Sequence, residues 1–304
     1  MSQQHTVGSA ILRFWQRSYA ADYVGLTILT AGLLLIELFI TPFHRLFSLS
    51  DLAISFPYAE VERVPLLLLF VYAFAIPLAV LVVYLLGSKA QSHKIHVTLL
   101  GLVISLVLTA FLTDVFKNAV GRPRPDLLAR CQAEKGTESV KLVGVDVCTQ
   151  PSHHKLHDGW RSFPSGHSSF SFSGLGYLAL FFAGQMHVFR PRIDLARTLV
   201  ALAPLVGAAL IAISRCEDYR HDVYDVTVGS LLGFLVANFV YRAYYPALRA
   251  VHPDVPYPVR SESLETKRHA KVRDEEAVRV SRGGSREVRA DERLLLRGRS
   301  SDRE

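Results

Sequence analysis

Six apolar runs of membrane-spanning length constrain this chain more than any other feature of its sequence. They cover residues 23–40, 64–86, 97–116, 168–188, 195–213 and 226–241. A helix needs roughly 20 apolar residues to cross a hydrocarbon core of about 30 Å. The fourth run is rich in Gly and Ser, which allow close contacts between helices in a membrane. We therefore expect an all-α fold, a bundle of six transmembrane helices.

The composition agrees with a membrane protein. Half of the 304 residues are hydrophobic, and the mean hydropathy is +0.24. Cytoplasmic loops of membrane proteins carry excess Lys and Arg, which accounts for the formal charge of +7 without a nucleic-acid partner. Residues 260–304 are highly charged and almost without aromatic side chains, which predicts disorder. The chain then divides into a polar lead (1–22), a six-helix domain (23–245) and a charged, disordered tail (246–304).

The distribution of positive charge predicts an orientation. Six spans put both termini on one side, together with the short basic connections 88–94 and 189–194. Lys and Arg are enriched on the cytoplasmic side, so both termini are expected in the cytoplasm, although the loop 117–163 is also basic. Three polar connections would then face a lumen or the exterior: 42–63, 117–163 and 214–225.

These outer connections carry the reactive side chains. A disulfide between Cys131 and Cys148 is chemically possible on that side. The connection 214–225 is dense in charge, and ionisable groups at membrane depth indicate a functional site. Its His221 and Asp225 are four residues apart and would share a helix face. The carboxylate can then hold one imidazole nitrogen and leave the other free as a nucleophile.

Three cations in these connections indicate an anion site. Lys117, Arg124 and Arg215 would repel one another without a bound anion of about two charges. Asp and Glu do not cluster in the sequence as Mg²⁺ ligands do. We therefore expect these cations to neutralise the charge of a phosphate, with no metal and no other cofactor.

A helix start completes the expected phosphate site. Pro164 favours a helix N-terminus, where the backbone N–H groups of Ser165, Gly166 and His167 can bind phosphate oxygens. The missing side chain of Gly166 permits a close approach of the ligand. His167 could protonate a leaving oxygen while His221 attacks phosphorus.

Three motifs support a resemblance to a known family. K-x6-R-P is matched by Lys117, Arg124 and Pro125, P-S-G-H by Pro164–His167, and S-R-x5-H-x3-D by Ser214, Arg215, His221 and Asp225. Over residues 23–245 the chain resembles the type 2 phosphatidic acid phosphatases, or lipid phosphate phosphatases, which are related to vanadium haloperoxidases. The wider context at 121–126 and 158–164 resembles the fungal diacylglycerol pyrophosphate phosphatases.

The resemblance implies an activity and a role for each motif residue. It implies Mg-independent hydrolysis of phosphatidate to diacylglycerol, and of diacylglycerol pyrophosphate to phosphatidate, in phospholipid metabolism. His221 would form a phosphohistidine, Asp225 would orient it, and His167 would protonate the leaving oxygen and then activate water. The residues implied to hold phosphoryl oxygens are Lys117, Arg124, Ser165, Gly166 and Arg215.

Several alternatives stay open from sequence. The motifs do not separate phosphatidate from polyisoprenyl diphosphates or sphingoid phosphates. A transporter or scaffold that only binds anions would need neither histidine, and six spans favour a lipid substrate over vanadate-dependent halide oxidation. The vacuolar, Golgi and plasma membranes all remain candidates, and the oligomeric state is open.

The remaining polar residues near the motifs are expected to be structural. We expect an ion pair of Asp114 with Lys117, a supporting or solvated Arg122, rim charges at Glu217, Asp218 and Arg220, a packed Cys216, and solvated His153, His154 and His157. The loop 42–63 is a candidate lid by its position.

Overall fold

The computed structural model describes residues 15, 18–191 and 194–258. Within these ranges the chain forms helices and no β-strand, with two isolated bridges between loops. Nearly all of the described residues belong to one compact unit, Asp22–Tyr257. Most of the lead and residues 259–304 of the predicted tail lie outside the described residues.

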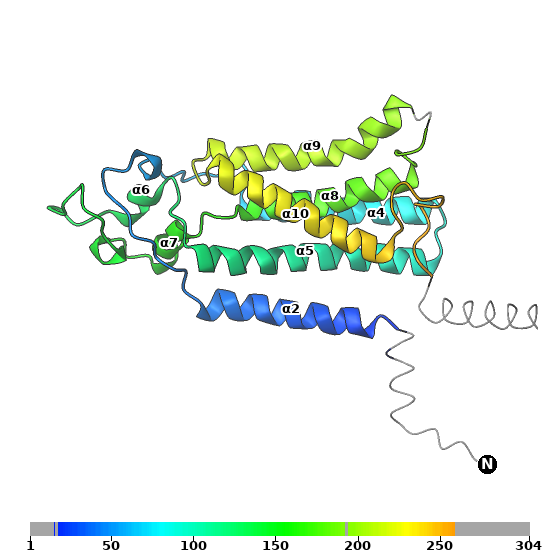
Figure 1. Ribbon diagram of the computed structural model, residues 1–304, viewed down its shortest axis with the longest axis horizontal. Coiled ribbons are helices and arrows are strands. Elements are labelled where there is room, and N and C mark those ends of the chain that lie inside the picture. Colours follow the sequence, from blue (N-terminus) through cyan, green and yellow to red (C-terminus); the bar gives the residue numbers. More distant parts are fainter. Residues whose placement is uncertain (1–14, 16–17, 192–193, 259–304) are drawn as a thin grey trace, which may run out of the picture. The chain divides into compact units, whose positions relative to one another are not determined.

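The helices follow the apolar runs of the sequence (Figure 1). The longer ones are α2 Ala20–Phe39, α3 Leu66–Phe70, a π-helical turn Val71–Ala75, α4 Ile76–Gly87, α5 Ser92–Val120, α8 Gly166–Gln185, α9 Leu195–Glu217 and α10 Val223–Tyr244. The short ones are α6 Leu127–Cys131, α7 His153–His157 and the 3₁₀ turns Leu52–Ile54, Val145–Val147 and Asp158–Trp160. In the described part of the chain, five helices are long and apolar enough to cross a membrane: α2, α3–α4, α5, α9 and α10. The chain is thus typical of an integral membrane protein.

The predicted fourth span, α8, differs in character from these five. It is buried along most of its length, so few of its residues can face lipid. Its hydroxyl groups bond across to α5: Ser173 with Ser105 at 2.7 Å and with Thr109 at 3.0 Å, and Ser169 with Thr113 at 2.8 Å. These bonds satisfy polar groups in an apolar surrounding, and small side chains let the helices approach closely.

Two glycines on α10 bring it against α8. A Cβ on Gly229 would lie 2.6 Å from the carbonyl oxygen of Ser165, and one on Gly233 would lie 2.0 Å from that of Ser169. No real side chain fits at these distances, so glycine is required for this backbone contact. The contact also places the start of α8 beside the start of α10, where the Ser165 N–H donates to the Asp225 carbonyl at 3.0 Å.

Pro77 interrupts the regular α-helix of the second span. Proline has no N–H to donate to the carbonyl four residues earlier, which here belongs to Ala73. The turn Val71–Ala75 before it is π-helical. The Ala73 carbonyl packs against α8, 1.7 Å from where a Cβ on Gly174 would stand.

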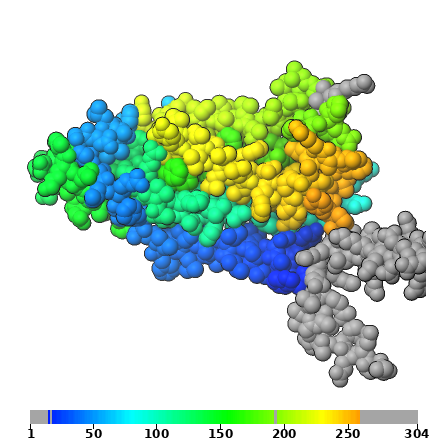
Figure 2. Space-filling model, viewed as in Figure 1, coloured from blue at the N-terminus to red at the C-terminus, as the bar shows by residue number. Residues whose placement is uncertain are grey.

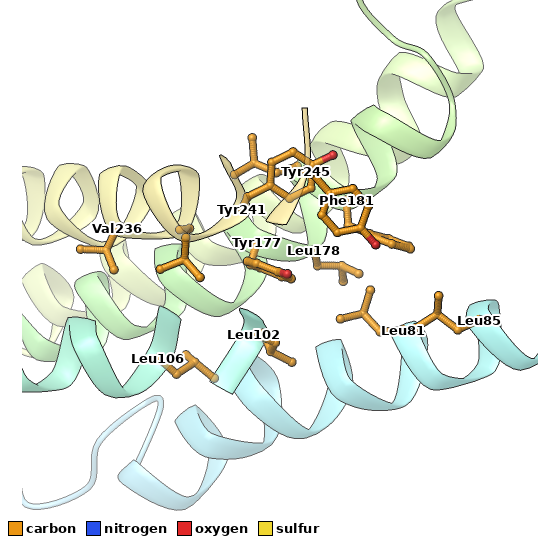
Figure 3. Close-up of a cluster of buried hydrophobic side chains, with 13 residues drawn as sticks. Leu81, Leu85, Leu102, Leu106, Tyr177, Leu178, Phe181, Val236, Tyr241 and Tyr245 are labelled. Atoms are coloured by element: carbon orange, nitrogen blue, oxygen red, sulfur yellow. The ribbon is translucent and has the colours of Figure 1, made fainter. Parts of the chain in front are cut away.

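The main hydrophobic core joins α4, α5, α8 and α10 (Figure 3), and none of the motif residues belongs to it. Its labelled members include Leu81, Leu102, Tyr177, Phe181, Val236 and Tyr241. Residues 246–257, which the sequence assigns to the tail, pack beside this core: Pro253 is buried, and the Tyr257 N–H donates to the Tyr244 carbonyl at 2.9 Å.

A second, smaller core joins the loops 42–63 and 117–163, which gather at one end of the helices (Figures 1 and 2). Cys131 and Cys148 form a disulfide in it. Trp160 is fully buried there, and its indole N–H donates to the Arg45 carbonyl at 2.9 Å. These loops therefore form a packed cap over the helix ends that carry the motifs.

Candidate active site

The three motifs meet in one cavity of about 640 Å³ beneath the cap. The motif residues that line it are Lys117, Arg124, Gly166, His167, Arg215 and His221. Ser165 and Asp225 are fully buried just behind its wall. The predicted convergence of the three clusters is thus what the folded chain shows.

Helix ends carry most of these residues. Lys117 lies in the last turn of α5, and Gly121 ends that helix with a φ of 57°. A Cβ on Gly121 would stand 1.8 Å from the Phe43 carbonyl oxygen, so glycine is needed for the conformation and for the contact. The turn directs the chain back toward Arg124.

The start of α8 supplies part of the predicted anion site. Ser165 is the N-cap of α8, and its own N–H is already bonded to Asp225, so it is not available to a ligand. The N–H groups of Gly166 and His167 have no partner among the described residues. A Cβ on Gly166 would lie 3.2 Å from the Lys117 ammonium, so glycine keeps that charge close to the helix start.

His221 is buried as a neutral imidazole with one accepting nitrogen. Its Nε2 lies 3.2 Å from NH1 of Arg124. Arginine can only donate, so Nε2 carries the lone pair and Nδ1 the proton. Burial and the neighbouring Arg124 lower the pKa of His221 to about 3. Nδ1 faces Asp225 Oδ2 at 3.7 Å, which is longer than a hydrogen bond.

Asp225 is held by other groups as well. Its Oδ1 accepts from Arg122 NH1 at 2.8 Å, and its Oδ2 accepts from Ser162 Oγ at 2.5 Å and from the Asp222 N–H at 3.1 Å. Arg122 therefore supports Asp225 through an ion pair and is not simply solvated. Ser162 was not identified from sequence, because its position relative to the motif carries no spacing rule.

The arginines of the motifs are already paired with carboxylates of the protein. Arg124 donates to the carbonyl oxygen and to Oδ1 of Asp158, both at 2.8 Å. Its charge, with that of Arg130, holds the pKa of Asp158 well below its usual range. Arg215 contacts Glu62 at 2.7 Å and Asp218 at 2.9 Å. Within the described chain, Lys117 has no hydrogen bond or ion pair.

Several supporting residues differ from expectation. Asp218 and Arg220 are buried rather than rim charges, whereas Glu217 is half exposed and pairs with Arg63 at 3.0 Å. Asp114 pairs with Arg161 at 3.2 Å and not with Lys117. Sequence reasoning missed these neighbours because loop carboxylates have no fixed spacing to a motif.

The Nε2–H group of His167 donates to a backbone carbonyl and does not point into the cavity. Its Nε2 lies 3.0 Å from the Val64 carbonyl oxygen, which can only accept, and 3.9 Å from Glu62 Oε2. His157, which we expected to be solvated, forms a hydrogen bond with His44 at 2.6 Å. No group of His, Cys, Asp or Glu in the described residues is arranged to hold a metal ion.

The chain was compared with known proteins. Residues 98–249 match the PAP2 superfamily. "Diacylglycerol pyrophosphate phosphatase 1" of Saccharomyces cerevisiae is 43% identical, over 80% of this chain and 86% of that protein. "Probable diacylglycerol pyrophosphate phosphatase 1" of Schizosaccharomyces pombe is 42% identical, over 83% and 89% respectively.

A plant protein is also similar to this chain. "Lipid phosphate phosphatase 2" of Arabidopsis thaliana is 37% identical, over 68% of this chain and 71% of that protein. No solved structure matches. With its three motifs in one cavity, its family match and these relatives, the chain belongs to the PAP2 superfamily.

Proposed function

We propose that this protein is an integral membrane lipid phosphate phosphatase that hydrolyses phosphatidate and diacylglycerol pyrophosphate. The observation that carries the proposal is the buried, neutral His221, whose lone pair lies in a cavity beside Arg124 and Lys117. A neutral imidazole is a nucleophile, and the adjacent cations suit a phosphoryl group. The names of the fungal and plant relatives agree with this activity.

The proposed reaction begins at His221 Nε2, which attacks phosphorus and forms a phosphohistidine. In the present arrangement Arg124 NH1 donates a hydrogen bond to the lone pair of His221 Nε2. Before the attack, this NH1 group would have to leave Nε2 and donate to a phosphoryl oxygen instead. Lys117, Arg215 and the free N–H of Gly166 would hold the other oxygens. Asp225 would balance the charge that develops on His221.

His167 would act on the leaving group and then on water. Its Nε2–H is bonded to the Val64 carbonyl in the present arrangement. For this step the ring would have to carry a second proton, and the negative charge of a bound phosphoryl group would favour that imidazolium form. A rotation of the ring into the cavity would bring one proton to the leaving oxygen and leave the ring neutral. In the second step the neutral ring would take a proton from the water that hydrolyses the phosphohistidine.

Charge neutralisation would come from cations of the protein rather than from Mg²⁺. The carboxylates Glu62, Asp114 and Asp158 in the cavity wall each pair with an arginine, so they are not free as ligands. We therefore propose that activity persists in EDTA.

The proposed membrane arrangement adds α8 to the five apolar helices as a sixth span. Its burial among the others explains why its composition need not be as apolar. Both termini would lie in the cytoplasm and the cap in a lumen or outside the cell, where the Cys131–Cys148 disulfide is stable. The vacuolar, Golgi and plasma membranes fit this arrangement equally.

The test is phosphate release from each lipid by the purified protein in detergent with EDTA. Wild type and His252→Ala, an exposed histidine outside the cavity, should both release phosphate. His221→Ala should release less than about a thousandth as much. No release by a folded wild type would contradict the proposed activity, and would direct attention to other lipid phosphates or to anion binding alone.

A further inference from the structure

The cavity extends past the motif residues to a second group of cations that surround one aromatic ring. Tyr58, Arg130, Lys155 and Arg220 all line it. The Lys155 ammonium lies 4.0 Å from the centre of the Tyr58 ring, and the guanidinium carbons of Arg220 and Arg130 lie 4.6 and 4.8 Å from it. None of these four residues belongs to a family motif. We call them the Tyr58 cluster.

Some donors of the Tyr58 cluster have no acceptor within the described chain, although Arg130 is paired with Asp126 at 2.8 Å and with Asp158 at 3.0 Å. Nε of Arg220 and NH2 of Arg130 are buried and have no partner in the described part of the chain. Among the described residues, the Lys155 ammonium forms an ion pair only with the exposed Glu60 carboxylate, at 3.9 Å. Cations that converge with unused donors indicate that an anion belongs nearby, because the ring alone offsets little of their mutual repulsion.

Glu62 shows that one anion can bridge the two groups of cations. Its Oε2 lies 2.7 Å from Arg215 of the motif, and its Oε1 lies 2.9 Å from Arg220 of the Tyr58 cluster. The two guanidinium groups are therefore close enough to contact the two ends of a single small anion. The Glu62 side chain is 26% exposed and belongs to the cap loop, so it can be displaced more easily than a core carboxylate.

We propose that the Tyr58 cluster is a second phosphoryl subsite, and that it recognises the inner phosphoryl group of a lipid pyrophosphate. The terminal phosphoryl group would occupy the site at His221, Lys117 and Arg124, and the inner one would replace Glu62 beside Arg220 and Lys155. This inference rests on the proposed phosphatase function and specifies its substrate class.

The chemistry of cleavage gives the subsite a part in the reaction. A bond forms between His221 Nε2 and the terminal phosphorus while the bond from that phosphorus to the bridging oxygen breaks. The electron pair stays on the bridging oxygen, which leaves with the inner phosphoryl group as phosphatidate. Arg220 and Lys155 face that group, so they stabilise the charge that it gains. With phosphatidate as substrate, no second phosphoryl group reaches them.

Lys155→Ala gives the sharpest test, because the Lys155 side chain has few other contacts. One charge-assisted hydrogen bond should change kcat/KM for diacylglycerol pyrophosphate by about 10-fold more than kcat/KM for phosphatidate. Lys155→Arg should restore most of the preference. Lys135→Ala, in the same loop and outside the cavity, should leave both values at the wild-type level. Equal losses on both lipids, or no loss on either, would overturn the proposal.

Inhibition by inorganic anions provides a second measurement that does not require turnover of the pyrophosphate lipid. Against phosphatidate hydrolysis, Lys155→Ala should weaken inhibition by inorganic pyrophosphate about 10-fold and inhibition by inorganic phosphate less than about 2-fold. Glu62→Gln removes the competing anion and should strengthen inhibition by pyrophosphate. A wild type that hydrolyses both lipids while Lys155→Ala keeps its ratio and its inhibition would refute the subsite alone. A wild type that hydrolyses neither would refute the proposed function.

Discussion

Gly233→Ala should damage the active site from a distance, through the contact between α10 and α8. The added Cβ would lie 2.0 Å from the Ser169 carbonyl oxygen, whereas an ordinary contact begins at 3.4 Å. The two helices must therefore separate locally by about 1.4 Å. The acceptor is backbone inside a helix, so it cannot move aside by changing a rotamer.

The magnitude follows from what the two helices carry. Overpacking of this kind costs about 1–3 kcal/mol of stability. The same displacement pulls Asp225 at the start of α10 away from Ser165 at the start of α8, and a misplacement of about 1 Å at a reacting centre can lower the rate about 100-fold. The loss should appear in kcat, because the proposed phosphate-binding cations Lys117, Arg124 and Arg215 lie on α5, the cap and α9.

Phosphate release and thermal unfolding in detergent measure both effects. Gly207→Ala is the matched control, since its Cβ would meet only Leu175 at 3.8 Å, an ordinary contact. In a helix interior this change should be neutral or stabilise by up to about 1 kcal/mol. If Gly233→Ala kept the kcat and the melting temperature of Gly207→Ala, the proposed role of the close helix contact would be wrong.

Three further predictions concern charge and covalent links. Burial lowers the pKa of His221 from 6.5 to about 3 in the folded protein. The unfolded chain therefore binds a proton that the folded chain does not, and the free energy of unfolding decreases as the pH falls below about 6.5. Between pH 7 and 5, wild type should lose about 2 kcal/mol more of this free energy than His221→Gln. Equal losses in thermal melts would contradict the buried neutral form. Arg122→Met leaves Asp225 without its 2.8 Å ion pair and should lower kcat about 10-fold or more at a similar KM, with partial recovery in Arg122→Lys; an unchanged kcat would remove Arg122 from the site. Replacing Cys131 and Cys148 by Ser removes a disulfide between residues 17 positions apart. This change should lower the free energy of unfolding, measured by denaturant titration, by about 3 kcal/mol. A wild type whose free energy of unfolding does not change when reductant is added would argue against this stabilisation.

The membrane helices could be predicted from sequence because hydrocarbon imposes a length and a composition. The ends of the helices could not, because they continue past the apolar residues. The run 97–116 stops before Lys117, yet α5 continues to Val120 and carries Lys117 into the cavity. The run 195–213 likewise stops before Arg215, which lies in the last turn of α9. Polar residues extend a helix here because the cavity, not lipid, surrounds them.

The motif residues could be assigned to one site because the apolar runs, read as six spans, put their connections on the same side. Their partners could not be assigned, since Glu62 and Asp158 reach the cavity only through the folding of the two cap loops. The ion pairs of Arg124 and Arg215 with these carboxylates were therefore not predicted. Buried charges need nearby counter-charges, but sequence does not show which carboxylate supplies them.

The central claim is that His221 becomes phosphorylated. The direct measurement is rapid quenching of His167→Ala with diacylglycerol pyrophosphate, followed by mass spectrometry of the peptide that contains residues 214–225. Pyrophosphate lipid has a good leaving group, so the first step should proceed without His167, while hydrolysis of the intermediate should slow and let it accumulate. We predict phosphate on His221 that is labile in acid and stable in base. Phosphate on another residue, or turnover with no covalent phosphate, would contradict the mechanism.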